Sequence, residues 1–167
     1  MDYRALVEEA IRQFPAGAFL VSGDEANPMT IGWGQFGVVW GKPTLTIMVR
    51  HSRYSEQLLQ QNGNFTVSFP APGTMKEALI VCGRNSGRDM DKKAAAGLET
   101  VPARVNGVPG IAGCAIHFEC RTMLRSEFPL DGLDKELYDR FYAANGDLHV
   151  LYFGEILAAY RDGENDA

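Results

Sequence analysis

The most informative segment of this chain is Asn27-Pro28-Met29-Thr30-Ile31-Gly32-Trp33-Gly34, and the next is Arg50-His51-Ser52-Arg53-Tyr54-Ser55. Each segment places backbone donors and hydroxyl groups beside the end of an expected strand. The second segment adds two guanidinium groups, which grip anionic oxygens well. A flat ring that carries a phosphate needs this combination of donors. The two segments therefore indicate a site for a nucleotide-like cofactor.

Outward from these segments, short apolar runs alternate with turns rich in glycine and proline. We expect strands at residues 18–22, 30–40, 44–49, 65–69, 115–125 and 149–160. We expect helices at 7–14, 75–82, 89–96 and 134–143, and one that starts with Ser55 as its N-cap and stops at Gly63. In the helix at 134–143, Leu137 and Phe141 are expected to face inward.

No strand-helix-strand unit repeats along the chain, which argues against a doubly wound fold. Many strands with few, short helices favour a mainly β protein, built as a closed or partly closed antiparallel barrel with peripheral helices. A length of 167 residues with 46% hydrophobic residues suits one domain with a sizeable core. We therefore expect residues 1–167 to form a single domain.

Charge and cysteine content narrow the functional classes. A net charge of −5, with 16 scattered Lys and Arg residues, argues against a nucleic-acid partner. Met1 to Phe14 carries Glu8 and Glu9 and has no uninterrupted apolar run, so we expect no signal peptide, no membrane span and a cytoplasmic location. Three cysteines without Cys-x-x-Cys spacing indicate apolar packing residues rather than disulfides or a metal site.

Three further stretches extend the pattern: Ser86-Gly87-Arg88-Asp89-Met90-Asp91-Lys92-Lys93-Ala94 followed by Ala96-Gly97-Leu98, then Phe118-Glu119-Cys120-Arg121, then Gly146 to Ile156. In this order, and with the two segments above, they resemble the flavin reductase-like family over nearly the whole chain. The resemblance implies that FMN is held in a Greek-key split β-barrel. It also implies a homodimer with FMN at or near the subunit boundary. Candidate interface material is residues 36–40 and the region around Phe141 and Tyr142, and a core placement explains these residues equally well.

The first segment suits the ring of the flavin. An isoalloxazine edge presents N3–H, O2, O4 and N5, and backbone amides on a glycine-bearing strand meet these atoms without bulk. Thr30 adds a hydroxyl and Trp33 a flat face. The candidate residues here are Asn27, Met29, Thr30, Ile31, Gly32 and Trp33. The alternative is that Trp33 belongs to the barrel core and that the glycines mark bulges.

The second segment suits the phosphate. Ser52 and Ser55 offer hydroxyls, the following helix offers free N–H groups, and Arg50 or Arg53 can hold two phosphate oxygens. Tyr54 belongs to the same candidate set. The alternative is an ordinary capped helix flanked by solvated arginines.

A third candidate set comprises Ser86, Gly87, Arg88 and Lys92. Lys92 lies one helical turn after Arg88, so both side chains are expected on one side near the start of the helix. In the family this segment closes over the flavin. Asp89 and Asp91 are interpreted as first-turn acids that stabilise the helix.

His149 is the one candidate for a catalytic group. It stands five residues before Gly154, as in the Gly-Asp-His pattern of the family, but Leu148 intervenes between Asp147 and His149. The resemblance implies a place on the nicotinamide or substrate side of the flavin. A strand histidine at the barrel rim is the alternative.

The function that follows is an FMN-binding oxidoreductase that passes electrons from NAD(P)H through FMN to an acceptor. One alternative is a flavoredoxin-like electron carrier whose FMN is reduced by a redox protein. Another is a split-barrel module for a different planar cofactor, such as haem or a deazaflavin. A transient nicotinamide visit requires no nucleotide-binding fingerprint in this fold, so the sequence separates the first two hypotheses poorly. The two basic segments and the region of Thr30 argue against the third.

Overall fold

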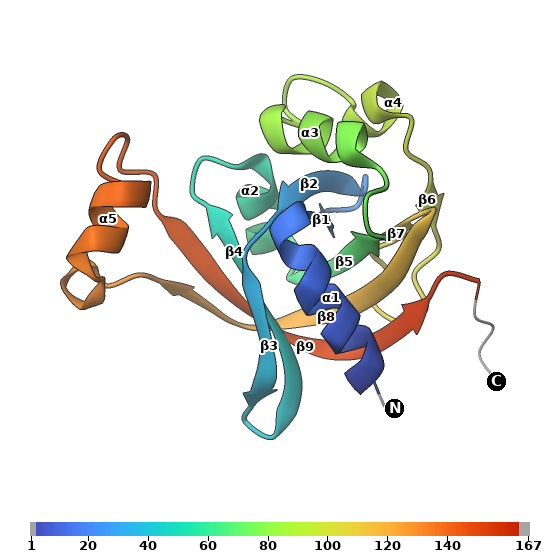
Figure 1. Ribbon diagram of the computed structural model, residues 1–167, viewed down its shortest axis with the longest axis horizontal. Coiled ribbons are helices and arrows are strands. Elements are labelled where there is room, and N and C mark those ends of the chain that lie inside the picture. The colour runs from blue at the N-terminus through green and yellow to red at the C-terminus, as the bar shows by residue number, and fades with distance from the viewer. Residues whose placement is uncertain (1–2, 164–167) are drawn as a thin grey trace.

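A curled antiparallel sheet forms the centre of the protein in the computed structural model, which describes residues 3–163 (Figure 1). Within that part of the chain, the sheet has seven strands in the order β2-β1-β5-β8-β9-β4-β3. Their bounds are β1 Ala18–Ser22, β2 Asn27–Ile31, β3 Gly34–Val39, β4 Lys42–Arg50, β5 Asn64–Pro70, β8 Cys114–Glu127 and β9 His149–Arg161. Residues 1–2 and 164–167, the ends of the expected domain, lie outside the described residues.

The sheet curls until its two ends approach each other. β2 and β3 are consecutive in the chain yet lie at opposite ends of the strand order, and β2 comes close to β4 without pairing with it. A separate two-stranded ribbon consists of β6 Thr100–Val101 and β7 Gly110–Ile111. The expected mainly β fold, a partly closed antiparallel barrel with short helices outside it, is confirmed.

The helices are short and peripheral. They are α1 Arg4–Gln13, η1 Phe14–Ala16, α2 Tyr54–Gln61, α3 Lys76–Arg84, α4 Lys92–Ala96, η2 Leu130–Gly132 and α5 Lys135–Phe141. Figure 1 shows α2, α3 and α4 gathered on the side where β2 lies, whereas α5 stands apart at the end of the extended β8 and β9. We call residues 128–148, which join these two long strands, the arm.

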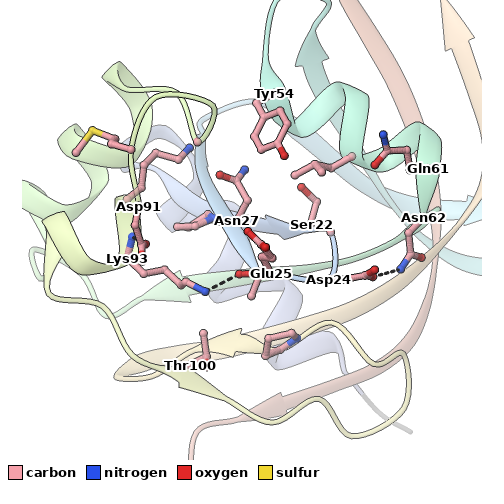
Figure 2. Close-up of a pocket in the computed structure, with 18 residues that line it drawn as sticks. Ser22, Asp24, Glu25, Asn27, Tyr54, Gln61, Asn62, Asp91, Lys93 and Thr100 are labelled. Carbon is pink, nitrogen blue, oxygen red and sulfur yellow. Dashed lines mark hydrogen bonds between the residues drawn. The ribbon is translucent and has the colours of Figure 1, made fainter.

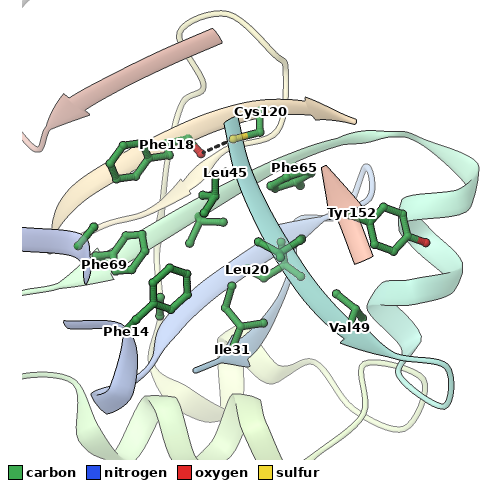
Figure 3. Packing of buried hydrophobic residues seen from close by; sticks show 14 of the residues in the cluster. Phe14, Leu20, Ile31, Leu45, Val49, Phe65, Phe69, Phe118, Cys120 and Tyr152 are labelled. Atoms are coloured by element: carbon green, nitrogen blue, oxygen red, sulfur yellow. Dashed lines mark hydrogen bonds between the residues drawn. The ribbon is translucent and has the colours of Figure 1, made fainter. Parts of the chain in front are cut away.

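The core explains the continuous apolar run of β1. Ala18 and Leu20 face the barrel interior, while Phe19 and Val21 face a second cluster that includes Leu79 of α3. A strand covered on both faces needs apolar residues at every position rather than at alternate ones. Phe14 closes the interior at one end, where its ring meets that of Phe69 edge-on at 5.0 Å (Figure 3). Cys82, Cys114 and Cys120 are all buried and free, so the packing role expected for them is confirmed.

Three local expectations were wrong. The strand expected at 30–40 breaks at Gly32 and Trp33 into β2 and β3, because the chain must pass there from one end of the sheet to the other. Helix α2 starts at Tyr54, so Ser55 lies inside its first turn and is not its N-cap. Leu137 is 47% exposed because the arm carries α5 away from the barrel, so its expected inward placement fails.

The helix expected at 89–96 is also shorter than its sequence pattern suggested. It begins at Lys92, and Asp91 is its N-cap, accepting hydrogen bonds from the backbone N–H groups of Lys93 and Ala94. Arg88 and Asp89 therefore precede the helix. Arg88 and Lys92 are not one helical turn apart, and Asp89 is not a first-turn acid.

Candidate functional site

Within residues 3–163, three neighbouring cavities lie along β2. A strand-edge pocket of about 180 Å³ lies beside the end of β2, and a basic pocket of about 270 Å³ lies beside the start of α2 and the loop from α3 to α4. The two share Met29 and Arg53. An outer groove of about 930 Å³ adjoins the basic pocket through Tyr54, Met90 and Lys92. Together they form a continuous row of cavities along one side of the barrel.

The structure brings nearly all the candidate residues of the sequence to these cavities. The strand-edge pocket is lined by Met29, Thr30, Ile31, Gly32, Trp33, Arg50, Arg53 and His149. The basic pocket is lined by Met29, Ser52, Arg53, Tyr54, Ser55, Ser86, Arg88 and Lys92. Asn27 and Gly87 line the outer groove instead, together with Tyr54 and Lys92 (Figure 2).

The strand-edge pocket lies beside β2, which is an end strand of the sheet. β2 pairs only with β1 in the strand order, so its other edge offers unpaired backbone N–H and C=O groups. Trp33 is 43% exposed and packs edge-on against Phe141 at 4.9 Å, so its interpretation as a barrel core residue is wrong. The hydroxyl of Thr30 donates to the carbonyl of Leu79 at 2.6 Å, which leaves it free only to accept. The pocket thus combines a free strand edge with an aromatic wall.

Positive charge dominates the basic pocket, although the chain as a whole is acidic. Arg53, Arg84, Arg88 and Lys92 line it, against the single carboxylate of Asp89. The guanidinium of Arg88 lies 5.1 Å from the centre of the Tyr54 ring and donates to the carbonyl of Ser52 at 3.1 Å. These contacts hold the cation at the rim.

Lys92 is the most unusual group in the basic pocket. The residue is only 3% exposed, and its Nζ makes no hydrogen bond among residues 3–163. Burial lowers the pKa of Lys92 to about 8, with Cys82 opposing this shift and Arg53 adding to it. A buried ammonium is costly unless an anion neutralises it. An anionic ligand in the basic pocket would offset this cost.

The wall between the basic pocket and the outer groove is tightly packed. Asn27 donates from Nδ2 to the Ser55 hydroxyl at 3.0 Å, and both side chains are buried. A Cβ at residue 87 would lie 2.1 Å from Asn27 Oδ1 and 3.0 Å from the Tyr54 ring, so only glycine fits there. Asn27, Ser55 and Gly87 thus build the wall, and one N–H of the Asn27 amide is already used by the Ser55 hydroxyl.

Arg50 and Ser52 are engaged with the arm. Arg50 donates from Nη1 to the carbonyl of Asp147 and from Nη2 to that of Phe141, and its guanidinium lies 5.3 Å from the centre of the Tyr142 ring. The backbone N–H and the hydroxyl of Ser52 both donate to the Asp147 carboxylate, at 3.0 and 2.6 Å. Arg50 lines the strand-edge pocket and not the basic pocket.

His149 begins β9 and forms part of the strand-edge pocket. It is 8% exposed, its Nδ1 lies 2.8 Å from the Tyr142 hydroxyl, and its ring is tilted against Trp33 at 5.3 Å. Burial lowers the pKa of His149 to about 4, with Arg50 and Arg53 acting in the same direction and Asp147 opposing them. The imidazole is therefore neutral near pH 7.

Sequence reasoning missed Met48, Arg84 and Asn85, which line these cavities. It also missed Tyr142 and Asp147, which form hydrogen bonds with the lining residues His149 and Ser52. Arg84 ends α3 two residues before Ser86, so its proximity to that segment was a usable signal. Nothing local in the sequence connects Asp147 with Ser52 or Tyr142 with the cavity, because those contacts depend on where the arm folds back.

Taken together, the molecule is a partly closed antiparallel barrel with a cationic pocket and a planar-walled pocket at one strand edge. The family model described as flavin reductase like domain matches residues 11–167. The chain therefore belongs to the flavin reductase-like family.

Among relatives, an uncharacterized protein of Archaeoglobus fulgidus is 29% identical over 160 residues, which cover 92% of this chain and 79% of that protein. The solved structure of flavoredoxin from Methanosarcina acetivorans has a TM-score of 0.68 and 27% identity, over 90% of this chain and 70% of that one. The NADH:FAD oxidoreductase of Streptomyces globisporus C-1027 has a TM-score of 0.67 and 23% identity, over 96% of this chain and 84% of that one, and this likeness shows the fold alone.

One further structural fact concerns membranes. Among residues 3–163, no helix is both long and apolar enough to cross a bilayer.

Proposed function

We propose that this protein binds FMN, with the isoalloxazine ring in the strand-edge pocket and the phosphate in the basic pocket, and that it acts as an NAD(P)H-dependent oxidoreductase. The observation that carries the proposal is Lys92, a buried cation without an acceptor in a pocket that adjoins a flat-walled one. Residues 1–167 acting as one domain, and pairing of two such chains, are part of the same proposal.

The residues present fit such a ligand. A phosphate dianion in the basic pocket would meet Lys92, Arg53 and Arg88, and the Ser86 hydroxyl lies in the same lining. The free edge of β2 from Met29 to Gly32 offers backbone donors and acceptors at the neighbouring pocket. Since the two pockets share Met29 and Arg53, one ligand can occupy both.

Bound FMN supplies the capacity to accept a hydride and to release electrons, which no side chain has. The chain contributes binding, orientation and exclusion of water. Trp33, packed against Phe141, presents aromatic surface to the strand-edge pocket, and the buried, neutral His149 adds no positive charge to it at pH 7. The cations of the basic pocket fix the phosphate end and so set where the ring lies.

A second candidate function is an electron carrier whose flavin is reduced by a protein partner. It is favoured by the likeness to the flavoredoxin of Methanosarcina acetivorans at 27% identity. The fold and the site are the same for both functions, so the identity of the electron donor separates them. A module for haem or a deazaflavin is not favoured by either of the structures compared above, a flavoredoxin and an NADH:FAD oxidoreductase.

The test is an anaerobic absorbance titration of the purified protein, first with FMN and then with NADH or NADPH. Bound flavin that bleaches within the mixing time on addition of a nicotinamide supports the reductase. Bound flavin that stays oxidised until a reduced redox protein is added supports the carrier. Failure to bind FMN at all would overturn both.

A further inference from the structure

The hydrogen bond between Tyr142 and His149 links the arm to the strand-edge pocket. Tyr142 is 4% exposed and His149 is 8% exposed, and the hydroxyl oxygen lies 2.8 Å from Nδ1. The two rings meet nearly at right angles, with their centres 5.6 Å apart. This is a buried pair of polar groups at the edge of a cavity, so each of its protons has few possible hydrogen-bond acceptors.

The direction of the hydrogen bond follows from which acceptors and donors are available to the phenol and the imidazole. Among residues 3–163 the Tyr142 hydroxyl has no acceptor other than His149 Nδ1, and leaving a buried O–H unpaired is costly. Burial also raises the pKa of Tyr142, so the phenol keeps its proton. The phenol therefore donates to Nδ1, and a neutral imidazole that accepts at Nδ1 carries its hydrogen on Nε2.

We propose that Tyr142 is a positioning residue that fixes His149 in the Nε2–H form, so that the imidazole presents a neutral hydrogen-bond donor to a carbonyl or ring-nitrogen acceptor of the flat ligand in the strand-edge pocket. This inference rests on the proposed function, because it names a contact made to that ligand. Nε2 has no acceptor within the described residues, so the donor is available.

The arm is held so that Tyr142 reaches this position. Arg50 donates to the carbonyls of Phe141 and Asp147, on either side of Tyr142, and its guanidinium lies over the Tyr142 ring. Asp147 is bound in turn by Ser52. Two anchors on the barrel therefore fix the segment that carries the phenol.

Charged groups around His149 support a neutral donor over a cationic one. Arg50 and Arg53 disfavour a second proton on the ring, Asp147 favours it, and burial is the largest influence against it. The phenol acts in the same sense as burial, because its hydrogen bond is accepted by a lone pair that protonation would remove.

The direct test is NMR of the imidazole nitrogens in the protein without flavin. The chain has three histidines, so the His149 signals are assigned by their absence in His149→Gln. We expect a pyridine-type Nδ1 and a pyrrole-type Nε2 at pH 7 in the wild type, and a mixture of the two neutral forms in Tyr142→Phe. We also expect the ring to titrate at a higher pH in Tyr142→Phe, because the contact that favours the neutral form is gone.

Tyr138→Phe is the matched control, since its hydroxyl makes no hydrogen bond within residues 3–163 and its ring lies 6.5 Å from that of Tyr142. It should leave the His149 signals unchanged. A pyridine-type Nε2 in the wild type, or the same tautomer and titration in wild type and Tyr142→Phe, would overturn the proposal. These spectra need no flavin and no turnover, so their outcome is independent of the proposed function.

A second pair of variants tests the donor in the loaded protein. The amide nitrogen of Gln can take the place of Nε2, whereas that of Asn takes the place of Nδ1. We therefore expect the rate of flavin reduction by NADH to be roughly tenfold to a hundredfold higher in His149→Gln than in His149→Asn, with KM for NADH reported separately from kcat. Equal rates for the two variants would contradict the role of Nε2 while leaving flavin binding, measured in parallel, as the test of the proposed function.

Discussion

At the scale of single residues, replacing Lys92 tests the proposed contact with the phosphate separately from the contacts with the rest of the ligand. Replacing it by methionine keeps the length and the packing but removes the charge. A charge-assisted contact contributes about 1.5–3 kcal/mol, so Lys92→Met should weaken FMN by roughly tenfold to a hundredfold. Riboflavin, which lacks the phosphate, should bind to wild type and variant alike, and fluorescence titration measures both ligands.

Lys93 provides the control for this substitution. It is the next residue of α4, but its ammonium donates to the carbonyl of Glu25 at the outer groove. Lys93→Met should leave the affinities for both flavins unchanged. If Lys92→Met reduces the affinity for riboflavin as much as that for FMN, the phosphate does not lie in the basic pocket.

The same lysine predicts how stability depends on pH in the protein without ligand. Burial lowers its pKa from 10.5 to about 8 in the folded state, so between these values the unfolded chain binds more protons and folding becomes more favourable as pH rises. The folded state carries the full penalty below pH 8 and none above about 10.5. Lys92→Met should therefore be more stable than wild type below pH 8, and this advantage should shrink as pH rises. Urea unfolding of both proteins at pH 7, 9 and 10.5 measures it, and a pH-independent difference would show that Lys92 carries no such penalty.

At the scale of elements, Arg50 connects β4 with the arm and not with the basic pocket. Its guanidinium is engaged by two arm carbonyls and by the Tyr142 ring. Arg50→Ala should release the arm, raise hydrogen exchange at residues 141–147 and weaken FMN and riboflavin by a similar factor. A loss of affinity for FMN alone would indicate that Arg50 binds the phosphate, as the sequence alone had predicted.

The elements also show what the sequence could and could not predict. The short strands and the peripheral helices follow from local patterns that the fold preserves. The proximity of Thr30, Arg53 and Lys92 to one another was implied by the resemblance to the family, because local patterns do not connect segments so far apart in the chain. The break at Gly32 and Trp33 does not follow from local patterns either, because it arises where the sheet closes and not from the local sequence. Ser52 and Arg50, expected at the phosphate, line two of the cavities, but their donors are taken by Asp147 and Phe141, whose position depends on an arm about ninety residues later in the chain.

At the scale of the whole molecule, the hairpin of β3 and β4 leaves apolar surface uncovered. Val38 is 71% exposed and Trp40 is 68% exposed, and beside them an apolar groove of about 370 Å³ runs between β3 and α1. β3 is also an end strand of the sheet, with a free backbone edge. Exposed large apolar groups on a sheet edge favour association, and they lie in the stretch that the sequence had marked as interface material.

We therefore expect the protein to be a homodimer that uses this hairpin. Trp40→Arg should shift the mass in sedimentation equilibrium from two chains to one at micromolar concentration, because a buried tryptophan is a frequent anchor of interfaces and an arginine in its place would lie desolvated against a second copy. Val105→Arg is the control, since Val105 is 59% exposed on the loop between β6 and β7, outside this hairpin. Flavin titration of the monomeric variant then tests whether the second chain completes the site: unchanged FMN affinity would place the whole site within one chain, and weaker binding would place part of it at the subunit boundary. If Trp40→Arg and wild type have the same mass, the hairpin is not the interface.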